Sequence, residues 1–212
     1  MTDPSTPDFD RIARAYRWLE YATLGPLLAR TRNCHLSLLQ DRSHALILGD
    51  GDGRFTAQLL ISCQTLKVEA VDLSLRMLSL QLHRCRAHED RLAIYCRDAR
   101  THLPHDTPDL VVTHFFLDCL SQAEVNALVA RLAPLLAPDA LWLVSDFRIP
   151  SGPLGWLARV YMRGLYLAFR ILTGLRTTHL PDHATALEHH GFVRIAERRR
   201  LGGLLTSQVW RR

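Results

Sequence analysis

The sequence of 212 residues has almost no lysine, since Lys67 is the only one among its 26 basic residues. Arginine therefore carries nearly all of the positive charge, a usage typical of a GC-rich bacterial genome. The net charge is +5, but the arginines are spread along the chain and cluster only at Arg198–Arg200 and Arg211–Arg212. A nucleic-acid site gathers its positive charge on one surface. We therefore expect no nucleic-acid partner.

Paired cysteines, long apolar runs and a signal sequence are also missing. The five cysteines are scattered and form no CxxC pair, which indicates reduced thiols rather than disulfides or a zinc site. No run of about 18 uncharged apolar residues is present, so no stable membrane insertion is expected. The first ten residues, MTDPSTPDFD, lack the apolar segment of a secretory signal. These features predict a cytoplasmic protein, and they leave its oligomeric state open.

Composition and periodicity predict a single α/β domain. The chain is 48% hydrophobic and 22% charged, as in average globular proteins. Short apolar runs alternate with segments of helical periodicity, which is typical of a doubly wound, mostly parallel sheet. The expected strands are Ala45–Leu48, Val68–Asp72, Leu92–Cys96, Leu110–Thr113, Leu141–Ser145, Val193–Glu197 and Leu204–Trp210, and the expected helices are Phe55–Ser62, Leu75–Ala87 and Ala123–Leu136.

Two segments lie outside this alternation. Residues 1–42 are predicted to form an N-terminal helical cap, with amphipathic helices within Phe9–Leu39. Residues 151–180, after the fifth strand, contain a densely apolar stretch, Leu154–Leu175, with arginines on one helical face. That helical insert has three interpretations: a helix packed on the core, a lid over an apolar substrate, or a peripheral membrane contact.

A glycine loop is the most informative stretch of the sequence. The first predicted strand runs into Gly49, Gly51 and Gly53, and a helix follows. Glycine is needed where the backbone turns with positive φ or lies against a ligand. A glycine turn between a strand and a helix is the usual nucleotide-site geometry of doubly wound sheets, although a purely structural turn would also explain it.

Acidic residues follow the next two strands. Asp72 closes the second strand, where a carboxylate can accept hydrogen bonds from both hydroxyls of a ribose. Asp98 follows the third strand, where a short acid can reach an adenine amino group. Each acid alone would also fit a solvated loop or a helix cap. Together with the glycines, they predict a ligand that contains adenosine.

The loop composition distinguishes between nucleotides. The third glycine of the dinucleotide pattern GxGxxG would fall at position 54, which is Arg54. Asp50 and Asp52 would repel a pyrophosphate, which such loops bind with backbone amides. S-adenosylmethionine, which carries a sulfonium and an ammonium group, tolerates these acids and is the predicted cofactor.

The chain resembles the class I S-adenosylmethionine-dependent methyltransferases along nearly all of its length. The matching motifs are ILGDGDGRF, VDLS, RDA and PDLVVTHFFLD, and the tail GFVRIAERRR…LTSQVWRR resembles the closing hairpin of that fold. The resemblance implies a seven-stranded sheet with its last strand antiparallel. The opening FDRIARAYRWLE is similar to that of the ubiquinone/menaquinone-type methyltransferases, and this implies that Tyr16 lines the active site. By the same match the cofactor-binding residues are Gly49, Asp50, Gly51, Gly53, Asp72, Leu73, Asp98, Ala99 and His114.

Two positions depart from the family pattern. Ile47 stands where the family usually has an acid that helps to hold the methionine end of the cofactor. Arg17 stands where the quinone methyltransferases usually have an aspartate.

Methyl transfer needs a nucleophile held in line with the methyl group, and a base helps where that nucleophile is a hydroxyl or an enol. His114, at the end of the fourth strand, is the candidate catalytic base, although it could also simply pack under Phe115. Asp118 could orient an imidazole or cap the following helix. Phe115, Phe116 and Trp156 could line an aromatic pocket or belong to the core.

The predicted function is methyl transfer to oxygen or carbon of a small lipophilic or aromatic metabolite. The alternatives are a non-catalytic binding module that keeps the fold and, less favoured, an NAD-dependent oxidoreductase. No metal site is predicted, because the histidines and the acid in His179, Asp182 and His183 lack a further ligand at a suitable spacing.

Overall fold

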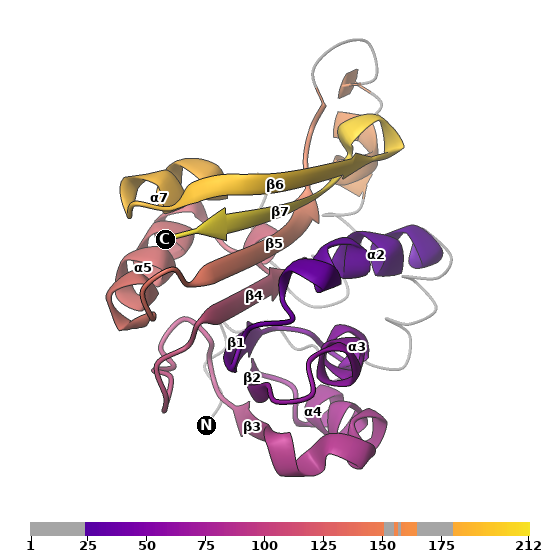
Figure 1. Cartoon of the computed structure of the whole chain (residues 1–212). Helices are drawn as coiled ribbons and strands as arrows, with labels where there is room; N and C mark the ends of the chain where they lie inside the picture. The colour runs from indigo at the N-terminus through magenta and orange to yellow at the C-terminus, as the bar shows by residue number, and fades with distance from the viewer. Residues whose placement is uncertain (1–23, 151–154, 157, 165–179) are drawn as a thin grey trace, which may run out of the picture.

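The computed structural model describes residues 24–150, 155–156, 158–164 and 180–212. Its strands form one seven-stranded sheet in the order β3-β2-β1-β4-β5-β7-β6 (Figure 1). β7 pairs antiparallel with both β5 and β6, and the pairs among β1–β5 are parallel. The predicted fold class is therefore confirmed. The strands are β1 (His44–Leu48), β2 (Lys67–Asp72), β3 (Leu92–Cys96), β4 (Leu110–His114), β5 (Leu141–Phe147), β6 (Val193–Arg200) and β7 (Leu205–Arg211).

The sheet is covered by helices on both faces, because consecutive side chains of its strands point to opposite sides. In β1, Ala45 and Ile47 pack with α3 (Arg54–Ser62), whereas Leu46 and Leu48 pack with α5 (Gln122–Leu132). Helix α7 (His183–His189) lies beside α5 on the same face (Figure 1). A strand that is buried on both faces has a continuous apolar sequence, as residues 45–48, ALIL, have here.

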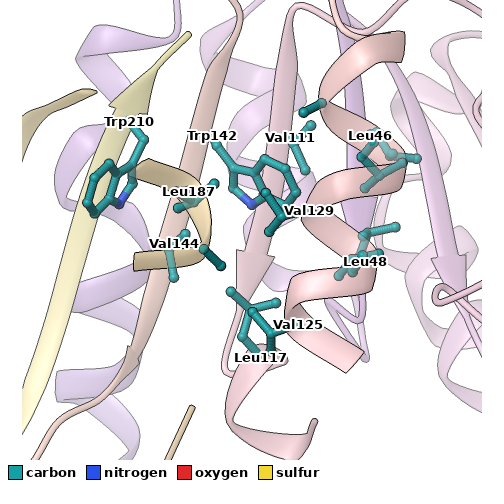
Figure 2. Close-up of a cluster of buried hydrophobic side chains, with 14 of the residues drawn as sticks. Leu46, Leu48, Val111, Leu117, Val125, Val129, Trp142, Val144, Leu187 and Trp210 are labelled. Atoms are coloured by element: carbon teal, nitrogen blue, oxygen red, sulfur yellow. The ribbon is translucent and has the colours of Figure 1, made fainter. Parts of the chain in front are cut away.

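Two tryptophans fill the α5–α7 side of the core (Figure 2). Trp142 of β5 and Trp210 of β7 are fully buried. Each indole N–H has a partner: Trp142 Nε1 donates to Thr113 Oγ1 at 3.1 Å, and Trp210 Nε1 donates to Gln208 Oε1 at 3.1 Å. The rings therefore enter the core without leaving a buried donor unpaired.

Two predicted helices end earlier than the sequence indicated. The expected helix Leu75–Ala87 is α4 (Leu75–Arg84), followed by the 3-10 segment η2 (Arg86–Arg91). The expected helix Ala123–Leu136 is α5, with a capping box between Ser121 and Glu124, and it gives way to η4 (Ala133–Leu135). Pro134 lacks the N–H that would continue the α-helical hydrogen bonding.

The two segments outside the alternation are described only in part. From the N-terminal cap, α2 (Gly25–Arg32) and η1 (Asn33–Leu38) are described, and residues 1–23, Tyr16 and Arg17 included, lie outside the described residues. Within 151–180, residues 155–156 and 158–164 are helical. Ala158 and Met162 are buried there, whereas Arg159 and Arg163 are exposed, as the predicted arginine face requires. Among the described residues, no helix is both long and apolar enough to cross a membrane.

Candidate active site

The carboxyl ends of β1, β2 and β3 meet at one edge of the sheet. The backbone N–H of Gly49 donates to the carbonyl of Val71 at 2.9 Å, and that of Arg97 donates to the carbonyl of Asp72 at 3.1 Å. These hydrogen bonds continue the parallel ladder beyond β1 and β3. The glycine loop, Asp72 and Asp98 therefore share one edge, as the sequence predicted.

The three loop glycines all have positive φ, but for different reasons. The φ angles are 70° at Gly49, 60° at Gly51 and 75° at Gly53. A Cβ atom at Gly49 would lie 2.6 Å from Cδ2 of Phe116, and one at Gly53 would lie 2.9 Å from Cα of Gln81. At Gly51 the nearest atom would be the Met77 sulfur at 3.9 Å. A side chain at Gly51 would therefore clash with nothing in the described part of the protein, so its positive φ and bare backbone suit the close approach of a ligand.

Asp50 is held inside the loop. Its Oδ2 accepts hydrogen bonds from Thr56 N at 2.9 Å and Thr56 Oγ1 at 2.7 Å, and Gln81 Nε2 donates to that hydroxyl oxygen at 2.9 Å. Asp50 thereby caps the start of α3, where Gly53 has no side chain to do so. Burial raises the pKa of Asp50 to about 6, against the lowering effect of the bonds from Thr56.

Asp52, the second acid of the loop, is also paired. Ile47, at the position where the family usually has an acid, belongs to the apolar core. Asp52 Oδ2 contacts Arg54 Nε at 3.0 Å and Arg84 Nη2 at 2.9 Å. Ile47 is 1% exposed and packs under α3. Both acids of the glycine loop are thus already paired within the described part of the chain. An ammonium group at the methionine end of the cofactor would share them with these partners.

Asp72 and Leu73 form the turn between β2 and α4. Asp72 Oδ1 accepts a 2.9 Å hydrogen bond from the backbone N–H of Ser74, and the Ser74 hydroxyl accepts one from Met77 N at 3.1 Å. The chain therefore orients the Asp72 carboxylate before any ligand binds. Leu73 is 39% exposed at the same edge.

Asp98 is paired with an arginine that the sequence did not indicate. Arg100 Nη2 lies 2.7 Å from Asp98 Oδ2, and Arg100 also contacts Glu124. Burial raises the pKa of Asp98, but the hydrogen bonds from Arg100 outweigh it, so this pKa lies below the usual value. Ala99 is buried, and its carbonyl accepts a 2.8 Å hydrogen bond from Arg131 Nη2. Asp98 is thus an oriented carboxylate that stays ionised.

His114 ends β4 but lies below the surface. It is 3% exposed, neither ring nitrogen has a hydrogen-bond partner within the described part of the chain, and its ring meets Phe55 edge-on at 4.3 Å. Burial, with smaller effects of Arg32 and His35, lowers the pKa of His114 well below its usual value. The imidazole is therefore neutral at physiological pH, and its catalytic role stays a prediction.

Strained backbone follows His114. Phe115 has φ 51°, an uncommon conformation for a residue with a side chain, which is found disproportionately at functional sites. The Arg32 guanidinium carbon lies 5.1 Å from the centre of the Phe115 ring, and the Phe147 ring lies 5.3 Å away. Aromatic side chains therefore gather at this edge. Trp156 is 58% exposed.

A buried pair of carboxyl groups at the same edge was missed from the sequence. Asp118 does not cap α5, whose cap is Ser121; its side chain instead pairs with Asp146, near the end of β5. Asp118 is 7% exposed and Asp146 2%. The available signal was an acid directly after the fifth predicted strand, Leu141–Ser145, much as Asp72 ends the second.

The histidine–acid cluster near position 180 has a structural role where it is described. Asp182 caps α7 by accepting a hydrogen bond from Thr185 N at 3.1 Å, and His183 Nε2 lies 3.1 Å from Gln208 Oε1. His179 lies outside the described residues.

Comparisons with known proteins agree with this architecture. A family model described as "Methyltransferase domain" matches residues 45–139. A sequence search against curated proteins finds no match. The chain is similar to the N-methyltransferase NodS from Bradyrhizobium japonicum WM9, with a TM-score of 0.61 and 15% identity, over 88% of this chain and 97% of that one.

The chain is also similar to larger O-methyltransferases. An O-methyltransferase family protein from Burkholderia thailandensis has a TM-score of 0.74 and 15% identity, over 98% of this chain and 64% of that one. An O-methyltransferase family 2 protein from Planctomyces limnophilus DSM 3776, in complex with apigenin, has a TM-score of 0.70 and 18% identity. The match covers 94% of this chain and 61% of that one. The chain thus spans less than two thirds of the length of these two proteins.

The fold is that of the class I S-adenosylmethionine-dependent methyltransferases, as the sequence predicted. The methyltransferase-domain model agrees with it over residues 45–139, slightly less than half of the chain, from Ala45 in β1 to Asp139 beyond α5. The cofactor of this class is S-adenosylmethionine, as the sequence predicted. The narrower similarity to ubiquinone/menaquinone-type enzymes stays a prediction.

Proposed function

We propose that this protein transfers the methyl group of S-adenosylmethionine to a hydroxyl oxygen or an enol carbon of a small lipophilic or aromatic metabolite. One observation carries the proposal: the glycine loop, Asp72 and Asp98 stand in register at the carboxyl ends of β1–β3, within a methyltransferase domain. Ligands of open α/β sheets bind at this edge.

The described residues fit the cofactor. Gly51 offers backbone without a Cβ in the way, and Asp72 offers a carboxylate already oriented by Ser74 N. In the proposal, Asp72 accepts hydrogen bonds from the ribose hydroxyls, and Asp98 accepts one from the adenine amino group beside Leu73 and Ala99. When bound, the cofactor supplies a methyl group on a positively charged sulfur. The protein then has to position the acceptor and remove a proton.

Two groups at the ends of β4 and β5 are candidates for the proton acceptor. His114 is neutral and so free to accept a proton, but its lowered pKa makes it a weak base. In the Asp118–Asp146 pair, burial raises both pKa values, and the neighbouring Asp118 raises that of Asp146 further, so the pair is a stronger base than an ordinary carboxylate. We retain His114 as the predicted base and regard the acid pair as its competitor.

The substrate class rests on the aromatic lining and on the structural neighbours. Phe115, Phe116 and Phe147 gather at the site edge, and aromatic rings favour flat apolar ligands. One structural neighbour is a mitomycin 7-O-methyltransferase, and another was solved with apigenin. We therefore propose a phenol or a related hydroxylated ring as the acceptor.

A non-catalytic binding module is the second candidate. The observation that favours it is that Ile47, a buried apolar residue, occupies the position where the family usually has an acid. Calorimetry with S-adenosylhomocysteine, followed by transfer of labelled methyl to a phenol panel that includes apigenin, separates the two candidates. Binding with turnover supports the enzyme, and binding without turnover on any acceptor supports the module. No heat at millimolar S-adenosylhomocysteine would contradict both.

A further inference from the structure

A second group of chemistry-bearing residues lies away from the glycine loop. Glu69, in the middle of β2, faces the connection between β3 and β4. Its Oε1 contacts Nε2 of His102 and lies 3.3 Å from Nδ1 of His105, and its Oε2 accepts a 3.1 Å hydrogen bond from the His105 backbone. One ligand atom from each of the three residues lies within 4.8 Å of the others. Two imidazoles and a carboxylate thus converge on a small volume.

This set of donors is one that transition metals prefer. Two histidines and one glutamate bind zinc at sites that keep an open position, and imidazole also suits nickel and copper. Bonds of about 2.0–2.1 Å in a tetrahedral arrangement place neighbouring ligand atoms about 3.3 Å apart. The His105–Glu69 spacing of 3.3 Å already matches. His102 Nε2 now contacts Glu69 Oε1 directly, so an ion would have to separate these two atoms and replace that contact.

The surroundings hold the ligands in place. The His102 side chain is 1% exposed, and its backbone carbonyl accepts a hydrogen bond from Arg131. Among the described residues, no group pairs with Nδ1 of His102, so the support of this ring comes from its packing and backbone. Tyr95 stacks on His105 with ring centres 4.7 Å apart and planes 15° apart. Rigid support of this kind is what a metal site requires.

The group also has access to solvent. Glu69 and His105 line a cavity of about 260 Å³ between the amino-terminal parts of β1–β3 and the β3–β4 connection, and Asp106 lines it as well. The His105 side chain is 55% exposed. A remaining coordination position would therefore be open to water.

We propose that Glu69, His102 and His105 form a binding site for a divalent transition-metal ion of the zinc class, separate from the methyltransferase site. An ion there would fasten the β3–β4 connection, residues 97–109, to β2. The sequence carries a short signal for it, HLPH at positions 102–105, but the carboxylate comes from a strand 33 residues earlier. Spacing alone therefore did not predict a metal site.

The test uses untagged full-length protein, stripped with a chelator and dialysed. We expect calorimetry to show one equivalent of Zn²⁺ bound, and Co²⁺ to give the visible absorption of a nitrogen–oxygen site. His105→Phe keeps a ring against Tyr95 and removes a ligand. It should weaken Zn²⁺ binding by about 100-fold or more, because loss of even outer hydrogen-bond partners costs about 10- to 100-fold.

The matched control is His83→Asn, which removes an exposed histidine on α4. It should bind Zn²⁺ as the wild-type protein does. Glu69→Gln serves as a second ligand variant if His105→Phe does not fold, as judged by circular dichroism without metal. Wild-type protein that binds no Zn²⁺, or ligand variants that bind it unchanged, would overturn the proposal. Neither readout depends on methyl transfer.

Discussion

The backbone N–H of Asp118 donates a 3.1 Å hydrogen bond to Oδ2 of Asp146, and the two buried side chains lie against each other. Burial raises the pKa of Asp118 to about 6, and burial together with the neighbouring Asp118 raises the pKa of Asp146 well above its usual value. Two such carboxyl groups cannot both ionise easily, so the pair holds a proton at neutral pH.

The acid pair predicts that stability falls as pH rises. The folded protein retains protons that the unfolded chain releases above about pH 4, so the free energy of unfolding decreases by about 1.4 kcal/mol per pH unit for each retained proton. Asp118→Asn replaces one titrating carboxyl by an amide of the same shape. We expect a smaller loss of stability between pH 4 and 8 than in the wild-type protein, measured by urea unfolding.

Asp50 contributes to the same slope, since its pKa is also raised to about 6. Some pH dependence should therefore remain in the Asp118→Asn variant. Identical slopes for the two proteins would show that the pair does not hold a proton.

Asp72→Ala should weaken binding of S-adenosylhomocysteine by about tenfold or more. A hydrogen bond to a charged group contributes about 1.5–3 kcal/mol, and the proposal gives Asp72 two ribose hydroxyls. Calorimetry measures the change, with Asp41→Ala, an exposed acid elsewhere, as the control. Unaltered affinity of the Asp72 variant would show that the ribose assignment is wrong.

Gly51→Ala and Gly53→Ala should separate binding from folding. Both positions have positive φ, which costs a residue with a side chain about 1–2 kcal/mol. Only at Gly53 would the new methyl group overlap Gln81, so that variant should lose more stability in thermal unfolding. Gly51→Ala should stay folded and lose cofactor affinity. The interpretation fails if Gly51→Ala binds S-adenosylhomocysteine like the wild-type protein.

His114→Phe should change acid stability and turnover in different directions. Burial keeps the His114 imidazole neutral in the folded protein, whereas in the unfolded chain it takes up a proton below about pH 6.5. The folded wild-type protein therefore loses stability as pH falls from 6.5. Phenylalanine beside Phe55 removes the part of that loss due to His114, which unfolding at pH 5 and pH 8 would reveal, whereas His35 and His183, whose pKa values burial also lowers, keep theirs.

If His114 is the base, turnover of the same variant falls by about 100-fold or more while affinity for S-adenosylhomocysteine is kept. Steady-state kinetics on any accepted phenol gives this value. Full turnover would remove His114 from the mechanism, and a matching loss in Asp118→Asn would point to the acid pair instead.

The strands were predictable because each is a short apolar run bounded by polar residues. The predicted strand Leu92–Cys96 has the observed bounds, and the others differ by at most three residues at either end. Helix ends were less predictable: Pro134 ended α5 early, and α4 gave way to a 3-10 segment after Arg84. Such ends depend on local hydrogen bonding that periodicity does not encode.

The candidate site was predictable only as far as strand ends determine it. That Gly49, Asp72 and Asp98 would meet follows from parallel pairing, which puts the carboxyl ends of strands together. Some partners of these residues did not follow from strand order, because Phe116 lies beside Gly49 from the end of β4, and Arg100 joins Asp98 to Glu124 of α5.

By itself, the order of apolar runs, glycines and acids determined the sheet and predicted the edge and the class of its proposed ligand. Tertiary structure alone decided that His114 is buried and that Asp118 and Asp146 form a buried pair of carboxyl groups. Glu69 likewise met two histidines only in the folded chain. The physical reason is that the pKa of a side chain depends on its burial and on the groups beside it in the folded chain. In these cases the neighbouring groups are distant in sequence.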